Sequence, residues 1–224
     1  MNNTERFPHL TKAPIFNELP KPFVKSFLDR CAIQTVQRKT QILREGVYPD
    51  AFYIVAHGTI DIFSESATGH RVLFHRAGQG ETVGELELIA NKVCTATCET
   101  GENALLLVCS KPQLFEAVRN PNFLRNLMQV LYTRLDRSNK FKVVDSCYPI
   151  EQRLCAYLKY LSARNLVITE NQLFLAELIG CSRQTINREL RVLRDLGIIE
   201  THNSRIEILD QEGLSDLAQP RVPS

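Results

Sequence analysis

The chain has 224 residues, of which 44% are hydrophobic and 23% are charged, and its formal net charge is +2. This composition is typical of a globular protein and excludes disordered and fibrous classes, and the length suits two medium-sized domains. So small a net charge produces no global field that points to a nucleic acid, and any such function must come from local clustering of charge.

The N-terminal stretch MNNTERFPHLTKAP contains no apolar run as long as a signal peptide requires. No window of the chain reaches the roughly 20 apolar residues of a membrane span. We therefore expect a cytoplasmic protein with no membrane partner. Seven cysteines, an odd number spread along the chain, fit reduced thiols better than a set of structural disulfides.

The first predicted element is a short helix within residues 14–31, entered through Pro20 and Pro22. From residue 33 to 109 the apolar residues alternate at period two, which predicts short strands. The alternating sets are Phe52, Ile54 and Ala56, then Ile60 and Ile62, then Val72 and Phe74, then Leu105 and Leu107. Turns that contain glycine separate these runs, so we expect an antiparallel roll or barrel that forms an N-terminal domain over residues 1–110.

After Lys111 the apolar spacing changes to three and four, and Pro121 suits the first turn of a helix that runs to about Val144. A helix of roughly 20 residues is about 30 Å long, more than the small roll can cover. We therefore expect residues 111–145 to form a long dimerisation helix and hinge; the alternative is packing on the chain's own β domain. The apolar stripe contains Leu124, Leu127, Met128, Leu131 and Leu135, and the dimerisation residues are expected to be Leu124, Met128, Leu131 and Leu135.

The segment DSCYPIEQR resembles a hinge, in which Asp145 or Ser146 can cap a helix and Pro149 suits the first turn of the next one. That next helix is expected to end near Asn165. Its apolar face contains Ile150, Leu154, Tyr157, Leu158 and Leu161. A second domain is therefore predicted over residues 146–224.

Within this second domain, a short apolar helix is followed by Gly180, and Ser182 offers a hydroxyl as the N-cap of another helix. The apolar residues of the first helix are Leu173, Ala176, Leu178 and Ile179, and those of the second are Ile186, Leu190, Leu193 and Leu196. This order predicts a helix-turn-helix. The stretch IIETHNSRIEIL then alternates around His202, Asn203 and Ser204, as the two strands of a wing would.

The other face of the second helix carries guanidinium and amide groups, which match the hydrogen-bonding edges of DNA bases. The predicted base-contacting residues are Arg183, Gln184, Asn187 and Arg188. The predicted phosphate-contacting residues are Ser182, Thr185, Arg191 and Arg205. The alternative is a helical bundle whose arginines lie on a solvated face. The turn, cap, stripe and wing agree with one another, which favours DNA binding.

The stretch IGCSRQTINREL is similar to the recognition segment of the cyclic AMP receptor protein/FNR family of bacterial transcription regulators. EGVYPDAFYIVAHGTIDIF and GQGETVGELELI resemble that family's sensor domain, and the likeness covers about residues 14–209. It implies an α+β fold with an N-terminal cyclic-nucleotide-binding-type antiparallel β-roll, a long dimerisation helix and a C-terminal winged helix-turn-helix. It further implies a homodimer that reads a near-palindromic site on double-stranded DNA, with its recognition helices ~34 Å apart. RNA polymerase and a small-molecule effector are candidate partners.

Compared residue by residue, Arg183 and Arg188 match the two arginines with which the family reads guanines in a TGTGA-type half-site. Gln184 stands where the cyclic AMP receptor has a glutamate that accepts a hydrogen bond from cytosine. An amide both donates and accepts, so we expect the preference at this base pair, and hence the half-site, to differ.

The expected effector pocket departs further from the family. Gly84, Glu85 and Leu86 match its Gly-Glu-Leu segment, in which the glutamate binds the ribose, but Cys94 and Thr95 replace the Arg and Ser that clamp the cyclic phosphate. A buried anion without a cation costs on the order of several kcal/mol, so we expect an effector other than cyclic AMP, or none. Ser138 and Asn139 complete the expected pocket, because they match the family's adenine contacts on the long helix.

Cys94 and Cys98 are four residues apart and would share a face if they lay on one strand. One interpretation is a redox or metal pair, with Cys109 or Cys31; the other is simple packing of apolar thiols. The spacing matches no standard zinc motif, so we predict no metal site, and the sequence requires no cofactor.

Glu85 and Glu87 would likewise share a face of an extended segment, as a carboxylate pair for acid-base chemistry would. No nucleophile or histidine accompanies them, so we do not expect an enzyme. The leading hypothesis is a transcription regulator whose roll senses an effector. The alternatives are regulation by a cyclic nucleotide or by oxidation of Cys94 and Cys98, and a DNA-binding module without an effector.

Overall fold

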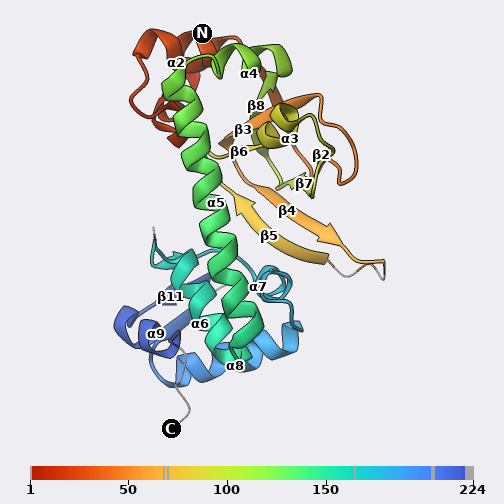
Figure 1. Ribbon diagram of the computed structural model, residues 1–224. Helices are drawn as coiled ribbons and strands as arrows, with labels where there is room; N and C mark the ends of the chain where they lie inside the picture. The colour runs from red at the N-terminus through yellow and green to blue at the C-terminus, as the bar shows by residue number, and fades with distance from the viewer. Residues whose placement is uncertain (1, 68, 70, 164, 203–204, 220–224) are drawn as a thin grey trace. The chain divides into compact units, whose positions relative to one another are not determined.

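The computed structural model describes residues 2–67, 69, 71–163, 165–202 and 205–219, and it divides into two compact units, Met1–Arg134 and Leu135–Ser224 (Figure 1). The longest helix, α5 (Pro121–Cys147), begins in the first unit and ends in the second. Among the described residues, no helix is both long enough and apolar enough to cross a membrane.

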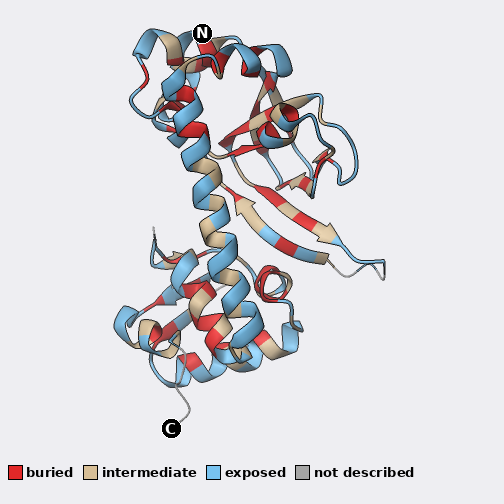
Figure 2. Ribbon diagram, in the orientation of Figure 1, coloured by how far each residue is buried: buried red, intermediate tan, exposed pale blue. Residues whose placement is uncertain are grey.

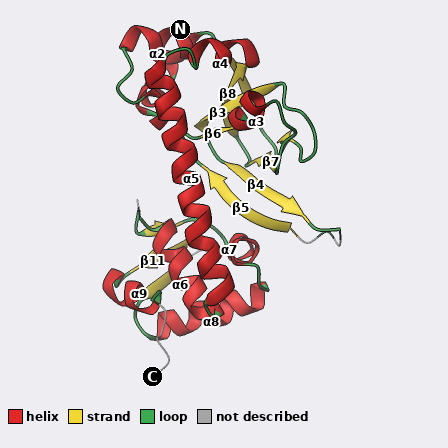
Figure 3. Cartoon of the chain, in the orientation of Figure 1, coloured by secondary structure: helices red, strands yellow, loops and turns green. Residues whose placement is uncertain are grey.

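Among its described residues, the N-terminal unit contains two four-stranded antiparallel sheets, as predicted for a β-roll (Figure 3). The first sheet has the order β1 (Ala32–Val36), β8 (Ala104–Ser110), β3 (Ala51–His57) and β6 (Thr82–Val83). The second has the order β2 (Gln41–Leu43), β7 (Thr97–Thr100), β4 (Ile60–Glu65) and β5 (Arg71–Ala77). Neighbouring strands in each order are paired antiparallel.

Short helices accompany these sheets. They are α1 (Asn3–Arg6), the 3₁₀ turns η1 (Pro8–Lys12) and η2 (Pro14–Phe16), α2 (Lys21–Asp29), α3 (Glu85–Ala90) and α4 (Lys111–Ala117). The helix expected within residues 14–31 is therefore shorter than predicted. Pro20 has an extended backbone and occupies the N-cap position, so α2 starts only at Lys21.

Strand β3 is largely buried (Figure 2), and its side chains contribute to both cores of the N-terminal unit. Phe52 and Ile54 face the larger core, whereas Val55 faces the smaller one. The larger core includes rings of α2 and α5, and the Phe27 ring lies 6.3 Å from Phe52 and 5.6 Å from Phe123, centroid to centroid. Such aromatic pairs contribute roughly 0.5–1.5 kcal/mol each beyond their buried area.

Buried and exposed residues alternate in β5, but the buried face of the strand is the one opposite to Val72 and Phe74. Leu73 and Ala77 are buried, whereas Val72 and Phe74 are exposed. A strand that carries apolar residues on both faces does not reveal by its sequence which face is covered.

Helix α5 starts at Pro121 as predicted, because the Asn120 side chain accepts hydrogen bonds from the backbone N–H groups of residues 122 and 123. It runs three residues past Val144, to Cys147. Asp145 and Ser146 therefore lie inside the helix and do not cap one, and Pro149 is the N-cap of the next helix. The chain between α4 and α5 leaves the helical conformation, so residues 111–145 contain two helices.

The C-terminal unit contains four helices after α5 and a three-stranded antiparallel sheet of order β10-β11-β9 among its described residues. The helices are α6 (Ile150–Leu161), α7 (Gln172–Ile179), α8 (Arg183–Asp195) and α9 (Gln211–Leu217), and the strands are β9 (Val167–Ile168), β10 (Ile199–His202) and β11 (Arg205–Ile208). Strands β10 and β11 pair from Ile199 with Ile208 to His202 with Arg205, which confirms the wing. The predicted turn residues Asn203 and Ser204 lie outside the described residues.

Candidate DNA interface and sensor segment

The helix-turn-helix is built by two side-chain caps and one glycine. Asn171 accepts a hydrogen bond from the N–H of Phe174 at 2.9 Å and starts α7. Gly180, at φ +73°, ends it, and Ser182 Oγ accepts from the N–H of Thr185 at 3.1 Å and starts α8. Because each cap satisfies a backbone group that the helix leaves open, the turn between α7 and α8 is fixed locally. The predicted roles of Gly180 and Ser182 are confirmed.

One face of α8 is buried against the C-terminal unit. Ile186, Leu190 and Leu193 lie on it, as predicted. Leu196 was expected to extend this stripe but is 60% exposed. It occupies the C-cap position after the last helical residue, and Gly197 then turns the chain with φ +72°. The helical periodicity therefore ends before Leu196.

The opposite face of α8 is exposed and carries the predicted base-contacting side chains Arg183, Gln184, Asn187 and Arg188. Nε and Nη2 of Arg188 both donate to Oε1 of Glu189, at 2.9 and 2.8 Å. The four side chains lie within the first two turns of the helix, which is the part that enters the major groove in helix-turn-helix proteins.

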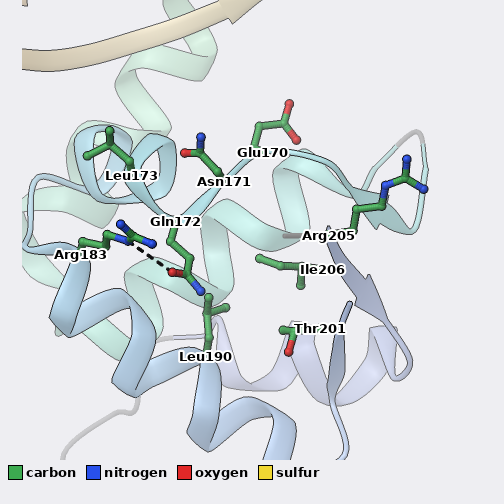
Figure 4. Close-up of a pocket in the computed structure, with 9 residues that line it drawn as sticks. All are labelled: Glu170, Asn171, Gln172, Leu173, Arg183, Leu190, Thr201, Arg205 and Ile206. Carbon is green, nitrogen blue, oxygen red and sulfur yellow. Dashed lines mark hydrogen bonds between the residues drawn. The ribbon is translucent and has the colours of Figure 1, made fainter. Parts of the chain in front are cut away.

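A hollow of about 540 Å³ separates the start of α7 from α8 and the wing (Figure 4). Its lining residues are Glu170, Asn171, Gln172, Leu173, Arg183, Leu190, Thr201, Arg205 and Ile206. Nε of Arg183 donates to Oε1 of Gln172 at 3.5 Å, drawn as the dashed line in Figure 4. A smaller hollow of about 230 Å³ continues along α8, and its lining includes Asn187, Arg191 and Arg194.

These hollows bring together residues that were assigned separately from the sequence. Arg205 of the wing and Arg183 of α8 line the same hollow. Sequence reasoning missed Gln172, which lines both hollows, and Thr201 of β10. The N-cap signal of Asn171 would have indicated where α7 begins and so that its first side chain reaches the start of α8. The cations of two elements and the N-terminus of α7 together form a surface suited to a phosphate backbone.

The predicted phosphate-contacting residues differ in their exposure and in the hydrogen bonds that they make within the helix cap. Arg191 and Arg205 are exposed. Ser182 Oγ and Thr185 Oγ1 lie 2.9 Å apart in the cap of α8, with Thr185 half-buried. In the structure these two side chains therefore cap the start of α8, the helix that carries the arginines.

In the N-terminal unit, the segment matched to a cyclic-nucleotide pocket begins at Gly84. This glycine has φ +89°, and a Cβ added here would lie 2.9 Å from Cδ1 of Leu43. A side chain at this position would therefore be strained by the backbone conformation and would require Leu43 to move. The next residues form α3, so the extended arrangement expected for Glu85 and Glu87 is wrong. Leu86 is exposed on this helix.

Glu85 is fully buried and pairs with a residue that sequence reasoning missed. Its Oε1 accepts a hydrogen bond from Nη1 of Arg134 at 2.5 Å, and Nη2 of Arg134 donates to the carbonyl oxygen of Thr82 at 2.6 Å. The second carboxylate oxygen, Oε2, has no hydrogen-bond partner among the described residues. The glutamate of this segment is thus already neutralised by a cation from α5.

Cys94 and Thr95 are the residues that were expected at the position of the phosphate clamp. Cys94 is buried, and its backbone N–H donates to the carbonyl oxygen of Val47 at 2.9 Å. Thr95 is exposed and donates to Oε1 of Glu87 at 3.3 Å. Neither side chain supplies a positive charge.

Cys94 and Cys98 do not share a strand, because only Cys98 lies in β7. Both nevertheless face the smaller core of the N-terminal unit. Burial raises the pKa of Cys94, and burial together with the neighbouring Cys94 raises the pKa of Cys98 to about 12. Among the described residues, no group of three or more His, Cys, Asp or Glu side chains is arranged to hold a metal ion.

Two further pocket candidates, Ser138 and Asn139, are exposed on α5 in the C-terminal unit. The proposed dimerisation residues lie earlier on the same helix. Leu124, Met128 and Leu135 are exposed, and Leu131 packs partly against the larger core. Leu127, which the sequence placed on the same stripe, is fully buried in that core.

Comparison with known proteins matches each unit to a family. Residues 33–120 match the cyclic nucleotide-binding domain, and residues 152–217 match the Crp-like helix-turn-helix domain. The chain is 24% identical over 205 residues to the cAMP-activated global transcriptional regulator CRP of Salmonella typhimurium, covering 84% of this chain and 94% of the relative.

Solved structures show the same fold. FixK2 from Bradyrhizobium japonicum has a TM-score of 0.78 at 14% identity, covering 86% of this chain and 99% of FixK2. The c-di-GMP responsive global regulator CLP of Xanthomonas campestris has a TM-score of 0.72 at 20% identity, covering 85% of this chain and all of that one. The order of a β-roll, a long helix and a winged helix-turn-helix is therefore shared along most of the chain.

Proposed function

The chain belongs to the Crp/Fnr family of DNA-binding transcription regulators, and from this premise we propose that it acts as a homodimer that reads a near-palindromic DNA site and responds to an effector other than cyclic AMP. Its proposed partners are double-stranded DNA, a second copy of itself and RNA polymerase, and its proposed compartment is the cytoplasm. The observation that carries the proposal is the exposed face of α8, which presents Arg183, Gln184, Asn187 and Arg188 beside a hollow that the wing helps to line.

Base reading is assigned to this face because of its chemistry. A guanidinium can donate two hydrogen bonds to guanine O6 and N7, and an amide can pair with adenine N6 and N7. Arg183 and Arg188 are the proposed guanine contacts, and Gln184 and Asn187 are the proposed amide contacts. Arg191 and Arg205 border the same surface and are the proposed phosphate contacts, together with Ser182 and Thr185 at the start of α8.

The proposed dimer forms through α5. Three apolar side chains, Leu124, Met128 and Leu135, are exposed at intervals of four and seven residues. This spacing keeps them on one side of a helix, where pairing with an identical helix would remove them from water. The adjacent face of the same turns, with Phe123 and Leu127, is already buried in the N-terminal unit.

The proposal of an effector other than cyclic AMP rests on the charge of the sensor segment. A cyclic phosphate is an anion, and Cys94 and Thr95 give it no cation at the clamp position. The nearby guanidinium of Arg134 already binds Glu85 and Thr82. The regulators similar to this chain include one named for cyclic AMP and one named for c-di-GMP, so this fold accommodates different effectors.

Selection of bound sequences from a random DNA pool tests the central claim. We expect enrichment of two inverted half-sites whose centres are about one helical turn, or a multiple of it, apart. Sedimentation of the purified chain tests the dimer separately. Enrichment of a single unpaired half-site, together with a monomer in sedimentation, would contradict the homodimer, and absence of any enriched sequence would contradict base reading.

A thermal-shift assay tests the effector claim, because a ligand that binds only the folded state raises the melting temperature. We expect no shift with millimolar cyclic AMP. A saturable rise with cyclic AMP would overturn this part of the proposal and leave the DNA-binding part intact.

A further inference from the structure

Two cysteines that are 78 positions apart in the sequence meet inside the N-terminal unit. The Sγ atoms of Cys31 and Cys109 lie 3.1 Å apart. Cys31 follows the end of α2, and Cys109 lies in β8 next to its last residue. Both are buried in the larger core, and Cys109 is fully buried. This separation is about 1 Å longer than a disulfide bond.

The surrounding side chains give the two sulfur atoms different hydrogen-bonding environments. Nε2 of Gln113 donates to Sγ of Cys31 at 3.3 Å and also to the carbonyl oxygen of Phe27 at 2.7 Å, so the amide is held in place. The Cys31 sulfur thus has two hydrogen-bonding neighbours that favour a negative charge on it, the Gln113 amide and the Cys109 thiol.

The acidities of the two thiols follow from this environment. The hydrogen bond with Cys109 lowers the pKa of the Cys31 thiol, and burial raises the pKa of the Cys109 thiol. Burial raises the pKa of Cys94, Cys98 and Cys155 as well. Since the thiolate is the nucleophilic form, Cys31 is the member of the pair that reacts first.

We propose that Cys31 and Cys109 are an oxidation site, at which a peroxide converts the two thiols into a reversible disulfide. The Cys31 thiolate attacks one oxygen of hydrogen peroxide, the O–O bond breaks, and the sulfur becomes a sulfenic acid while water leaves. Cys109 then attacks the Cys31 sulfur, the S–O bond breaks, and a second water leaves. In total, two thiols lose two electrons and two protons to one peroxide, which yields one disulfide and two waters.

The bond would join two layers of the N-terminal unit. It links the end of α2 to β8, and β8 continues directly into α4, since Ser110 ends the strand and caps the helix. Gln113, the residue that contacts Cys31, lies in α4. A disulfide here joins residues 78 positions apart, and a cross-link over that length restricts the unfolded chain strongly. Oxidation is therefore expected to raise the melting temperature of the N-terminal unit.

The experiment treats the folded, full-length protein with hydrogen peroxide, blocks free thiols with N-ethylmaleimide and maps the peptides by mass spectrometry. We expect a peptide pair linked through Cys31 and Cys109, which dithiothreitol separates. Recovery of both cysteines as alkylated thiols, or linkage of either one to another cysteine, overturns the proposal.

Two variants sharpen the result. Cys109→Ala is expected to abolish the linked peptide, because it removes the second thiol of the bond. Cys94→Ala/Cys98→Ala is the matched control, because it removes two buried thiols of the same unit and is expected to leave the Cys31–Cys109 link intact. If Cys109→Ala destabilises the fold, the melting temperature of the unaltered chain tests the proposal instead. It rises on oxidation and returns with dithiothreitol if the bond forms, and an unchanged value contradicts the bond.

Discussion

The fully buried carboxylate of Glu85 and the guanidinium of Arg134 form an ion pair with a nitrogen-to-oxygen distance of 2.5 Å. The pair joins the start of α3 to α5 within the N-terminal unit. A buried charge that loses its partner typically costs about 3–5 kcal/mol, more than the intact pair contributes. Arg134→Met should therefore lower the free energy of unfolding of this unit by about that amount, as measured by urea denaturation.

A double variant that removes both charges of the pair completes this test. In Arg134→Met/Glu85→Gln the buried charge is absent, so we expect recovery of a large part of the lost stability. Arg125→Met is the control, since Arg125 is exposed on the same helix and its replacement should change the unfolding midpoint little. Equal destabilisation by Arg125→Met and Arg134→Met would show that the ion pair is not what matters.

Arg183 and Arg191 lie on one helix but are assigned different roles. Arg183→Ala should reduce affinity for the preferred site by about 1–3 kcal/mol and relax the preference at one base pair, because a bidentate guanine contact is lost. Arg191→Ala should weaken binding to preferred and random DNA alike, since a phosphate carries no sequence information. Fluorescence anisotropy with both DNAs measures this, and identical patterns for the two variants would refute the assignment.

Gln184 is exposed on α8 and is the residue that we expect to set the DNA preference of this chain apart. Gln184→Glu replaces an amide with an acceptor-only carboxylate, so cytosine should become preferred at the contacted base pair. Selection from a random pool would show the change at a single position of each half-site. Asp195→Asn changes an exposed charge at the far end of the same helix and should leave the selected sequence as it was.

Arg153 of α6 connects the end of α5 to the helix-turn-helix. Its Nη2 donates to the carbonyl oxygen of Ile179, the last residue of α7, and lies 3.4 Å from Oδ1 of Asp145. A charged hydrogen bond of this kind contributes about 1.5–3 kcal/mol. Arg153→Met should destabilise the C-terminal unit by that order and weaken specific DNA binding. Lys159→Met, an exposed cation of the same helix, should have a small effect on both thermal unfolding and affinity.

Two buried thiols should make the free energy of unfolding depend on pH in the alkaline range. Burial raises the pKa of Cys98 and of Cys155 from 9.0 to about 12. Because the folded state holds each proton to a higher pH than the unfolded state does, the stabilisation is fully present below pH 9 and is lost as the pH rises toward 12. Each thiol should contribute a slope of about −1.4 kcal/mol per pH unit in that window.

Urea denaturation of the reduced protein between pH 8 and 11 measures this slope. Cys98→Ala and Cys155→Ala should each make it shallower, whereas Cys147→Ala removes an exposed thiol and should not. If all three variants keep the slope of the unaltered chain, other groups dominate the alkaline dependence.

The parts of the fold that the sequence predicted correctly depend on contacts between near neighbours. Ser182 caps α8 through a bond to a residue three positions on, and the stripe of Ile186, Leu190 and Leu193 follows from helical geometry alone. The α3 segment was misread because Glu-Leu-Glu-Leu alternates like a strand. The left-handed Gly84 and the burial of Leu88 decide for a helix, and neither is visible in the pattern.

The relationships that the sequence could not supply join distant positions. Arg134 is 49 residues from Glu85, and Cys109 is 78 residues from Cys31. No local propensity links such residues, because their meeting depends on the closure of the whole roll. Gln172 escaped notice for a related reason. Its importance comes from the hollow beside Arg183, which exists only once the wing and both helices are in place.

The contact between Arg188 and Glu189 affects how binding should depend on salt. Each arginine that neutralises a phosphate releases cations condensed on the duplex, and the number of released cations sets the slope of log affinity against log salt. Arg188 is held by Glu189 at 2.8 Å, and Arg194 lies 3.9 Å from a carboxylate oxygen of Asp195. While those carboxylates stay in place, α8 releases fewer counterions than its four arginines suggest. We therefore expect random DNA to be held weakly at physiological ionic strength, and we expect a site that draws Arg188 away from Glu189 to gain selectivity from the exchange.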